Sequence, residues 1–373
     1  MANKKIGITG QNGFLGNHIK NQIQYQFTDF ELLDFKRSFF EDQKQLSIFV
    51  NSCDVIIHLA GLNRHKSDKE ITNTNIKLAE VLGTSLIKNN YKGSLIFSSS
   101  LRENENTPYG KSKKKAGEIL AKAANSIGFS FIKLIIPNIF GPFGKPYYNS
   151  FITTFSHQLI KGQAPKILLD ASIPMIYVDS VVRHIIDSIK FEGIHNIEIP
   201  YQIKKKVSNV LNQLEDFQKS YIENGIIPKF ESTFDIQLFN SFRSAINPKE
   251  FFPTSYKIHE DERGYFSELI RNHSKGQVSF SSTKPNITRG NHFHTRKIER
   301  FSVIQGEAKI ALRKIGSDDI IEFKLSGTHP AYVDMPIWTT HNITNIGNKD
   351  LITVFWINEH YDPEDADVFF EKV

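Results

Sequence analysis

Residues Gly7–Gly16 read GITGQNGFLG, and they precede an amphipathic stretch, Phe14–Gln26. With the apolar run before them, they predict a strand, a glycine turn and a helix. The first glycine of such a turn permits a tight bend, the second lets the backbone approach a pyrophosphate, and the third lets helix and strand pack closely. The helix N-terminus adds free N–H groups, so a dinucleotide site is favoured over an ordinary glycine turn. The expected contact residues are Gly10, Asn12, Gly13, Phe14, Leu15 and Gly16.

The next predicted strand ends at Asp34, where an acid commonly holds the ribose 2′-hydroxyl of NAD. Lys36 and Arg37 follow directly and could bind the 2′-phosphate of NADP. We therefore expect NADP(H) as the cofactor and keep NAD(H) as the less favoured choice. The alternative interpretation of the same residues is a solvated charge cluster in a loop.

The first half of the chain alternates short apolar runs with longer amphipathic stretches, which is typical of a parallel sheet covered by helices. The predicted strands are Lys5–Thr9, Phe30–Leu33, Val55–Leu59, Ser94–Ser98 and Phe131–Ile136, the last of which closes the series. The predicted helices are Phe14–Gln26, Asn73–Asn89 and Tyr109–Ser126. This half predicts a Rossmann-type α/β domain.

After about residue 250 the pattern changes to short alternating runs separated by Gly, Asn and Asp turns, which indicates a small antiparallel barrel or sandwich. The expected strands are Gln277–Ser281, Arg300–Ile304, Lys309–Arg313, Ile320–Phe323 and Leu351–Ile357. The segment Phe242–Pro253 contains two prolines at the change. We therefore expect two domains of different class, residues 1–245 and 246–373.

Composition narrows the class of protein. The chain has 373 residues, of which 39% are hydrophobic, so it can bury a sizeable core. No apolar run reaches the ~18 residues of a membrane span, the first residues do not resemble a signal peptide, and the one cysteine fits a reducing cytoplasm. The net charge of +6 is spread along the chain without an aromatic-basic motif, which disfavours nucleic acid and suits an anionic small substrate.

Tyr109 and Lys113 lie four residues apart at the start of a predicted helix, so both project from one face. Upstream, a strand ends in Ser98–Ser100. With the glycine turn and the HLAG segment His58–Gly61, this order of motifs over about residues 4–245 resembles the extended short-chain dehydrogenase/reductase family. The resemblance implies that Tyr109 donates a proton to a carbonyl, that Lys113 lowers the tyrosine pKa and holds the nicotinamide ribose, and that Ser100, less favourably Ser99, binds the carbonyl oxygen. It also implies cofactor contacts at Ala60 and Gly61.

Two features narrow the expected chemistry. Sugar-nucleotide dehydratases of this family carry a Thr-Asp-Glu group just after the serine, whereas this chain has Leu101-Arg102-Glu103, so a reductase is favoured. The segments Pro137–Pro142 and Tyr147–Phe151 resemble nucleotide-sugar-binding parts of the family. This resemblance implies that Asn138 and Asn149 contact the substrate, and a structural role is the alternative for each.

A histidine cluster lies in residues 290–306, GNHFHTRKIERFSVIQG. His292 and His294 are two residues apart on a strand and face one side, Glu299 follows, and His341 comes from a later strand. Three imidazoles and a carboxylate suit a divalent metal with an open position, zinc first, with manganese, iron or nickel as alternatives. The spacings G-x-H-x-H-x4-E-x6-G and P-x4-H-x3-N resemble the cupin superfamily over about residues 253–373, which implies a jelly-roll barrel.

The segment Asp261–Phe266 also resembles cupin-class sugar-nucleotide 3,5-epimerases, in which a histidine after an Arg-Gly pair is the base. Here Arg289-Gly290 precedes His292, which is assigned to the metal, so the base stays open. A reductase joined to a metal cupin resembles the bifunctional CapF-like reductases of capsule and O-antigen biosynthesis.

That resemblance implies C3 epimerisation of a UDP-2-acetamido-2,6-dideoxy-4-keto-hexose in the cupin, then NADPH-dependent C4 reduction to UDP-2-acetamido-2,6-dideoxy-L-talose, on the route to UDP-N-acetyl-L-fucosamine. Members of that family also suggest a homodimer. Two other interpretations stay open: a purely structural or dimerising cupin, and a redox-sensing protein without catalysis.

Overall fold

The structure is a computed structural model that describes residues 3–262, 264–273 and 275–373. The chain divides into two compact units, residues 1–154 with 167–209, and residues 155–166 with 210–373. The boundary predicted at residue 245 stays a prediction. Among the described residues, no helix combines the length and the apolar character that a membrane crossing requires.

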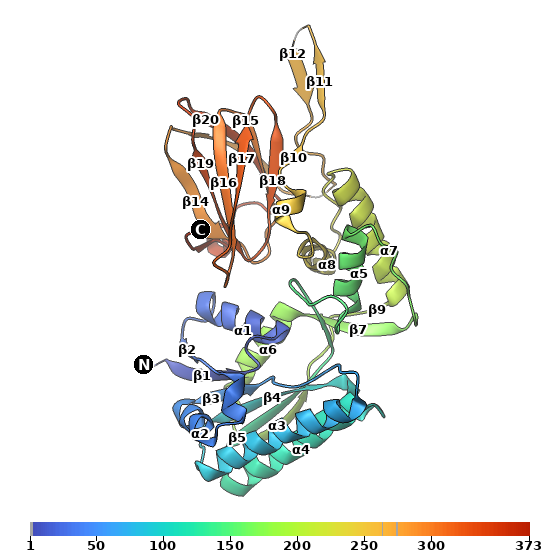
Figure 1. The fold of residues 1–373 in the computed structure, drawn as a ribbon, viewed down its shortest axis with the longest axis vertical. Coiled ribbons are helices and arrows are strands. Elements are labelled where there is room, and N and C mark those ends of the chain that lie inside the picture. The colour runs from blue at the N-terminus through green and yellow to red at the C-terminus, as the bar shows by residue number, and fades with distance from the viewer. Residues whose placement is uncertain (1–2, 263, 274) are drawn as a thin grey trace. The chain divides into compact units, whose positions relative to one another are not determined.

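The first unit is built on a six-stranded parallel sheet in the order β2-β1-β3-β4-β5-β8 (Figure 1). Its strands are β1 (Lys4–Thr9), β2 (Phe30–Leu33), β3 (Val55–His58), β4 (Ser94–Ser100), β5 (Ser130–Ile136) and β8 (Ile194–Glu198). The helices wholly within this unit are α1 (Phe14–Tyr25), α2 (Gln43–Ser52), α3 (Asp68–Lys88), α4 (Pro108–Ile127) and α6 (Val178–Ser188). A second sheet contains β6 (Asn138–Phe140), β7 (Ser172–Tyr177) and β9 (Ile203–Lys206). The predicted Rossmann-type fold is confirmed.

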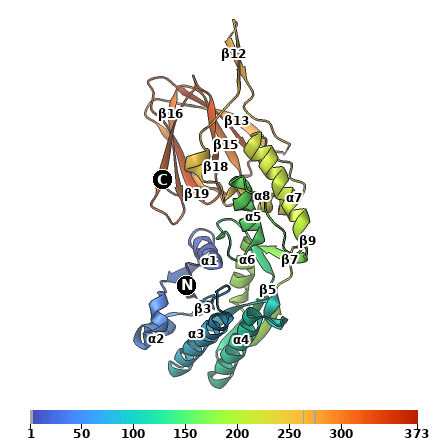
Figure 2. The same ribbon diagram turned by 45° about the vertical axis from the view of Figure 1, so that its right-hand side comes forward.

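Alternate strand residues face opposite helix layers. On β3, Ile56 belongs to the core that includes residues of α2, α3 and α4, whereas Ile57 belongs to the core that includes residues of α1 and α6. Both side chains are fully buried. A strand covered on both faces is apolar throughout rather than alternating, which explains the run of apolar residues in β3. Figure 2 shows α3 and α4 side by side on one of these faces.

Several elements differ from the sequence prediction. The sheet does not end at β5, because β8 pairs beyond it; the alternating exposure of this edge strand gives no continuous apolar run. Helix α3 begins at Asp68, before the predicted start at Asn73, because the Ser67 hydroxyl caps the Glu70 N–H. Helix α2 was not expected, and only three of its residues are buried.

The second unit contains two five-stranded sheets, in the orders β10-β18-β15-β20-β13 and β17-β16-β19-β14-β21, and a separate hairpin. The strands of the first sheet are β10 (Thr254–Ser255), β13 (Gln277–Thr283), β15 (Glu299–Gln305), β18 (Ala331–Met335) and β20 (Leu351–Ile357). Those of the second are β14 (Thr288–Phe293), β16 (Glu307–Lys314), β17 (Ile320–Ser326), β19 (Thr339–Asn345) and β21 (Phe369–Phe370), and the hairpin is β11 (Ile258–Asp261) and β12 (Gly264–Ser267). The expected all-β cupin fold is confirmed.

Helices also belong to this second unit. They are α8 (Thr233–Arg243), α9 (Pro248–Phe251) and the π-helical turn Gln218–Glu223, while α5 (Phe151–Ile160) and α7 (Val207–Phe217) each extend across the division. A buried ion pair joins β15 to β18, with Arg300 Nε 2.8 Å from Asp334 Oδ1. Tyr221, from the π-helical turn, donates a hydrogen bond to Asp334. The helical segment is therefore tied to the strands by a buried polar network.

Candidate functional site

The glycine turn requires glycine at two positions for steric reasons. Gly10 has φ +82°, and a Cβ there would lie 2.9 Å from the Ala60 nitrogen. A Cβ on Gly16 would lie 2.4 Å from the Gly10 oxygen, so α1 can approach the turn only without a side chain. Gly13 is the N-cap of α1; no side chain caps this helix, and its first turn has no acidic residue. Its first N–H groups are therefore suited to bind an anion.

The predicted ribose-binding residues lie beside this turn and are exposed. Gln11 Nε2 donates to Asp34 Oδ1 at 2.6 Å and to the Phe35 carbonyl at 2.9 Å. These bonds tie the end of β2 to the glycine turn. Lys36 and Arg37 follow at the solvent-exposed start of a 3-10 turn. The arrangement leaves both cations accessible to a phosphate.

One cavity of about 580 Å³ brings most predicted residues of the first unit together. It is lined by the predicted residues Gly10, Asn12, Gly13, Phe14, Leu15, Gly16, Gly61, Ser100, Tyr109, Lys113, Asn138 and Asn149. Asp34, Lys36, Arg37 and Ala60 do not line it. The glycine turn and the Tyr-Lys pair thus share one space.

Tyr109 and Lys113 lie on the first turns of α4. Thr107 caps this helix and Pro108 occupies its first position, so its start is fixed locally. Burial lowers the pKa of Lys113 to about 8, and its Nζ lies 4.7 Å from the centre of the Phe97 ring. Burial raises the pKa of Tyr109 to about 12, although the charge of Arg102 opposes that rise. At neutral pH the tyrosine is therefore a protonated phenol beside a charged lysine.

The three serines that end β4 all line the cavity but differ in their partners. The Ser99 hydroxyl donates to Glu103, whose other oxygen lies 2.9 Å from Lys133 Nζ. Glu103 is buried and absent from the cavity lining, so this carboxylate serves the packing of the strand ends. Ser100 accepts a bond from the Arg102 N–H at 3.3 Å and lines the cavity. Because the Ser99 hydroxyl is used by Glu103, the geometry favours Ser100 as the hydroxyl available to a ligand.

Asn75, a buried residue of α3, was not predicted from the sequence. Its Oδ1 accepts from the Leu62 N–H at 2.6 Å, and its Nδ2 donates to the Leu62 carbonyl and to Ser112 Oγ, both at 2.9 Å. A Cβ on the neighbouring Gly61 would lie 3.0 Å from Asn75 Oδ1 and 3.8 Å from Lys113 Nζ. Asn75 thus joins the loop after β3 to the helix that carries Lys113. Helical spacing from Ala79 places this asparagine on the apolar face of α3, and a polar residue there was the available signal.

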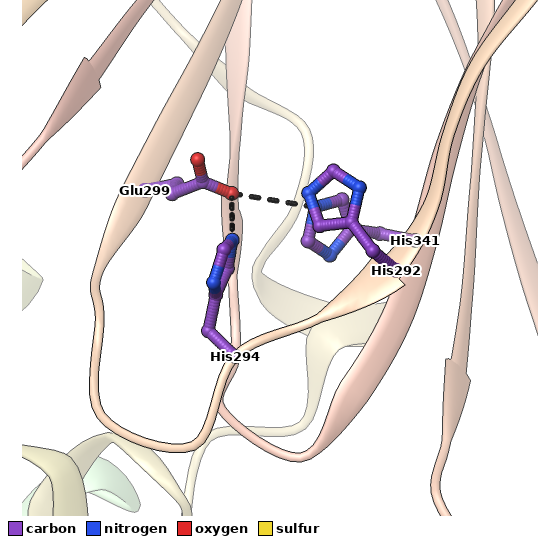
Figure 3. A group of neighbouring side chains, drawn as sticks. All are labelled: His292, His294, Glu299 and His341. Carbon is purple, nitrogen blue, oxygen red and sulfur yellow. Dashed lines mark hydrogen bonds and ion pairs between the residues drawn. The ribbon is translucent and has the colours of Figure 1, made fainter. Parts of the chain in front are cut away.

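The second unit brings together all four predicted metal ligands: His292, His294, Glu299 and His341, whose ligand atoms lie within 4.8 Å of one another (Figure 3). His292 of β14 is paired in register with His341 of β19, and Glu299 begins β15. His294 Nε2 and His341 Nε2 lie 3.0 and 3.3 Å from the same oxygen of Glu299.

The outer nitrogens of two rings are bound to carbonyls. His294 Nδ1 lies 2.5 Å from the Asp367 oxygen, and His341 Nδ1 lies 3.2 Å from the Thr339 oxygen. A carbonyl only accepts, so Nδ1 must carry the proton in each ring, and a neutral ring then turns a lone pair on Nε2 toward Glu299. Lone pairs that converge on a carboxylate require a cation between them, either a proton or a metal ion. The donor set therefore fits a divalent metal.

The charges in this cluster follow the same logic. Burial by itself raises the pKa of Glu299, but hydrogen bonds and charges from His294 and His341 outweigh it and hold the pKa of this carboxyl below its usual range. Burial, with the two other histidines, lowers the pKa of His292 to about 4. His292 is therefore neutral. Burial also lowers the pKa of His294, but the hydrogen bond and charge of Glu299 outweigh burial and raise that pKa, so a proton competes with a metal ion for His294 Nε2.

Comparison with known proteins relates the chain to described families. Residues 6–196 match the NAD dependent epimerase/dehydratase family, and residues 259–369 match the polysaccharide biosynthesis C-terminal domain. The chain is 30% identical over 370 residues, 98% of each chain, to the UDP-2-acetamido-2,6-beta-L-arabino-hexul-4-ose reductase of Pseudomonas aeruginosa. It is 23% identical over 119 residues, 29% of this chain and 79% of the relative, to the spore coat polysaccharide biosynthesis protein SpsL of Bacillus subtilis.

Among solved structures, the capsular polysaccharide assembling protein CapF of Staphylococcus aureus is similar to this chain with a TM-score of 0.62 and 32% identity. The match covers 99% of this chain and 100% of that one. In this chain the NAD dependent epimerase/dehydratase match is followed by the polysaccharide biosynthesis C-terminal domain. Because the Pseudomonas aeruginosa reductase and the Staphylococcus aureus CapF match this chain over nearly its full length, the chain belongs to the CapF-like family.

Proposed function

We propose that this chain is a bifunctional enzyme of nucleotide-sugar biosynthesis, a UDP-sugar ketoreductase that uses NADPH and carries a C3 epimerase in its C-terminal unit. The observation that carries the reductase half is the shared cavity, in which the glycine turn, Ser100, Tyr109 and Lys113 line one space. The name and full-length similarity of the Pseudomonas aeruginosa reductase support the substrate class.

In the reductase half, a bound nicotinamide cofactor would supply the hydride for the C4 ketone. Tyr109 is proposed to donate its phenolic proton to the carbonyl oxygen as negative charge develops there. The Lys113 charge would stabilise the phenolate that remains, and Ser100 would hydrogen-bond the same carbonyl oxygen. The pKa values of about 12 for Tyr109 and about 8 for Lys113 support these roles, because at neutral pH the tyrosine has a proton to donate and the lysine is charged.

The charge of the cavity supports an anionic substrate. Its lining contains the cationic residues Arg64, Arg102, Lys113 and Lys145, and no aspartate or glutamate is among the described residues that line it. A UDP-sugar and a dinucleotide each bring a diphosphate, and uncompensated cations attract such groups. Asn138 and Asn149 line the same cavity and are proposed to contact the sugar nucleotide.

In the C-terminal half, His292, His294, Glu299 and His341 are proposed to hold one divalent metal ion, zinc first. Such an ion acts as a Lewis acid toward a ketone oxygen. The proposed reaction is removal of the proton at C3, next to the C4 ketone, and its return on the opposite face. The residue that moves this proton is not assigned, because His292 belongs to the ligand group.

We further propose that epimerisation comes first and that reduction then gives the 6-deoxy-L-talosamine sugar nucleotide, on the route to UDP-N-acetyl-L-fucosamine. We also propose that the protein is a homodimer and is cytoplasmic, and the single cysteine supports the cytoplasmic location. The polysaccharide biosynthesis match over residues 259–369 supports a role in making a surface polysaccharide precursor.

One experiment separates the two activities. The full chain is given the UDP-linked 4-keto sugar in heavy water without NADPH, and deuterium at C3 is measured by NMR. We expect incorporation with the metal-loaded protein and none after chelation. NADPH is then added, and its oxidation is followed by absorbance. Absence of deuterium at C3 with the metal-loaded protein would refute the epimerase half, and a folded, metal-free protein that still exchanges C3 would refute the metal's role.

A further inference from the structure

A buried aspartate near the C-terminus holds the loop between two of the metal ligands. Asp367 is only 7% exposed. Its Oδ1 accepts from the Thr295 N–H at 3.1 Å and from the Thr295 hydroxyl at 2.6 Å. Its Oδ2 accepts from the N–H groups of Arg296 at 3.1 Å and Lys297 at 3.0 Å. Four donors of the segment between His294 and Glu299 thus converge on one carboxylate.

The same residue contacts the ligand His294 directly. The Asp367 carbonyl accepts the bond from His294 Nδ1, and this bond fixes which ring nitrogen faces Glu299. Asp367 has φ +46°, in the left-handed region that a residue other than glycine adopts only at a cost. The four bonds to its carboxylate hold the backbone in this conformation. One residue therefore fixes both the ligand loop and the ring orientation.

Neighbouring contacts strengthen the connection between the C-terminal segment and the ligands. Lys297 Nζ donates to the Ala366 carbonyl at 2.8 Å. Strand β21 pairs with the end of β14, where His292 lies opposite Phe370. The rings of Phe293 and Phe369 are stacked with centroids 5.3 Å apart. Residues 366–370 thus form the outer support of the ligand group.

We propose that Asp367 is a positioning residue of the metal centre, which orients His294 and fixes the span from His294 to Glu299. The inference rests on the proposed metal centre. Outer partners of metal-bound histidines commonly affect metal affinity by about 10- to 100-fold. Asp367 is separated from His294 by 73 residues in the sequence, so no ligand motif contains it.

The test compares two variants in the full chain. Asp367→Asn keeps the size of the side chain, and asparagine tolerates the left-handed backbone, but its amide group cannot accept the N–H bonds that one carboxylate oxygen accepts. Asp365→Asn is the matched control: Asp365 is exposed and contacts the guanidinium of Arg296, 2.8 Å from Nη2. Binding of Co²⁺ is followed by its visible spectrum and by competition with a chelator. We expect about 10- to 100-fold weaker binding in Asp367→Asn and less than about 2-fold change in the control.

The outcomes are distinguishable. Equal Co²⁺ affinity and spectra in folded Asp367→Asn and in the unsubstituted chain would overturn the positioning role. If the unsubstituted chain binds no Co²⁺, the metal centre itself fails, and this inference fails with it. Should Asp367→Asn not fold by circular dichroism, Thr295→Val removes only the 2.6 Å hydroxyl bond, and we expect about 5-fold weaker binding, as for the loss of one hydrogen bond. Unchanged binding in Thr295→Val would then count against the proposal.

Discussion

The cavity of the first unit and the histidine group of the second differ in what holds them together. The cavity depends on backbone: two glycines allow close approach, and a helix start without a side-chain cap faces the space. The histidine group, which consists of His292, His294, Glu299 and His341, depends on side chains. The ligand atoms of these four side chains converge on one point. The first arrangement leaves room for a large diffusible ligand, and the second leaves room for an ion.

The two sites also treat buried charge in opposite ways. Lys113 has no ion pair among the residues that the structure describes, so burial makes its proton easier to lose. Glu299 has two imidazoles against one oxygen, and their hydrogen bonds outweigh burial and keep its charge. An unpaired buried cation is costly to folding and is therefore a sign of function, whereas a partnered carboxylate is satisfied by its own neighbours.

The largest effect is expected from a substitution at Tyr109, which should impair the reductase activity and not the exchange at C3. Tyr109→Phe keeps the ring and removes the proposed proton donor, so we expect NADPH oxidation with the 4-keto sugar to fall by about 10²- to 10⁴-fold. Incorporation of deuterium at C3 without NADPH should stay unchanged, since the exchange is proposed to take place in the other unit. Both are measured on the same protein, by absorbance and by NMR.

Tyr148→Phe is the matched control, because Tyr148 lines the same cavity. Its reductase rate should change by less than about 10-fold, as expected for one lost contact. If the two variants lose reductase activity equally, Tyr109 is not the proton donor. If Tyr109→Phe also loses exchange at C3, the two activities are not separate.

The second prediction tests the cost of the unpaired cation. Lys113→Met should lower reductase activity and make the cofactor-free protein more stable. The shift of the Lys113 pKa from 10.5 to about 8 corresponds to roughly 3 kcal/mol at neutral pH. Between pH 8 and 10 the unfolded chain binds more protons at this lysine than the folded chain, so the unfolding free energy of the unsubstituted protein should rise with pH through that window.

Urea unfolding at pH 7 and pH 9.5 measures both effects. The variant should lack the rise that Lys113 gives the unsubstituted protein. If Lys113→Met is less stable than the unsubstituted chain at pH 7, the buried charge of Lys113 does not destabilise the folded protein, and this prediction is wrong. Reductase activity should also fall as pH rises through about 8, because the lysine then loses its charge.

The residues of a site can be predicted from the sequence when they lie close together along the chain. The residues of the glycine turn are neighbours in the sequence, and Tyr109 and Lys113 lie on one helix. Sequence spacing therefore predicts which residues of each motif lie together, and the cavity lining contains them. The four metal ligands follow two short motifs and were also brought together: one motif runs from the end of β14 through the following loop to the start of β15, and the other lies in β19. The fold class was confirmed in both halves.

The residues that support these sites could not be found in the same way. Asp367 acts on a loop 70 to 72 residues earlier, and Asn75 is a single polar residue on an apolar helix face. Neither belongs to a local motif. The edge strand β8 was missed for a related reason: its residues alternate in exposure, and its place in the sheet depends on pairing with β5.

The close approach of α1 to the glycine turn depends on the absence of a side chain at Gly16. Gly16→Ala would place a Cβ 2.4 Å from the Gly10 oxygen and move α1 away from the turn, so we expect NADPH affinity to fall by at least about 10-fold and stability to drop by about 1–3 kcal/mol. Gly128→Ala is the control, because Gly128 has φ +77° with nothing within 4 Å. It should cost about 1 kcal/mol of strain and leave NADPH binding unchanged. Equal loss of binding in both variants would show that general destabilisation, and not the turn, is responsible.

The smallest expected effect lies at the exposed rim, where Lys36 and Arg37 are proposed to bind the 2′-phosphate of NADPH. Solvent and salt screen exposed charges, so the double substitution Lys36→Ser with Arg37→Ser should weaken NADPH binding by only about 10-fold. NADH binding should hardly change, because NADH lacks that phosphate and Asp34 remains held by Gln11. Fluorescence titration with both cofactors at low and high salt measures this, and the difference between the variant and the unsubstituted chain should shrink as salt rises. Equal weakening for NADH and NADPH would contradict the assignment, since both cations would then act on a part that the two cofactors share.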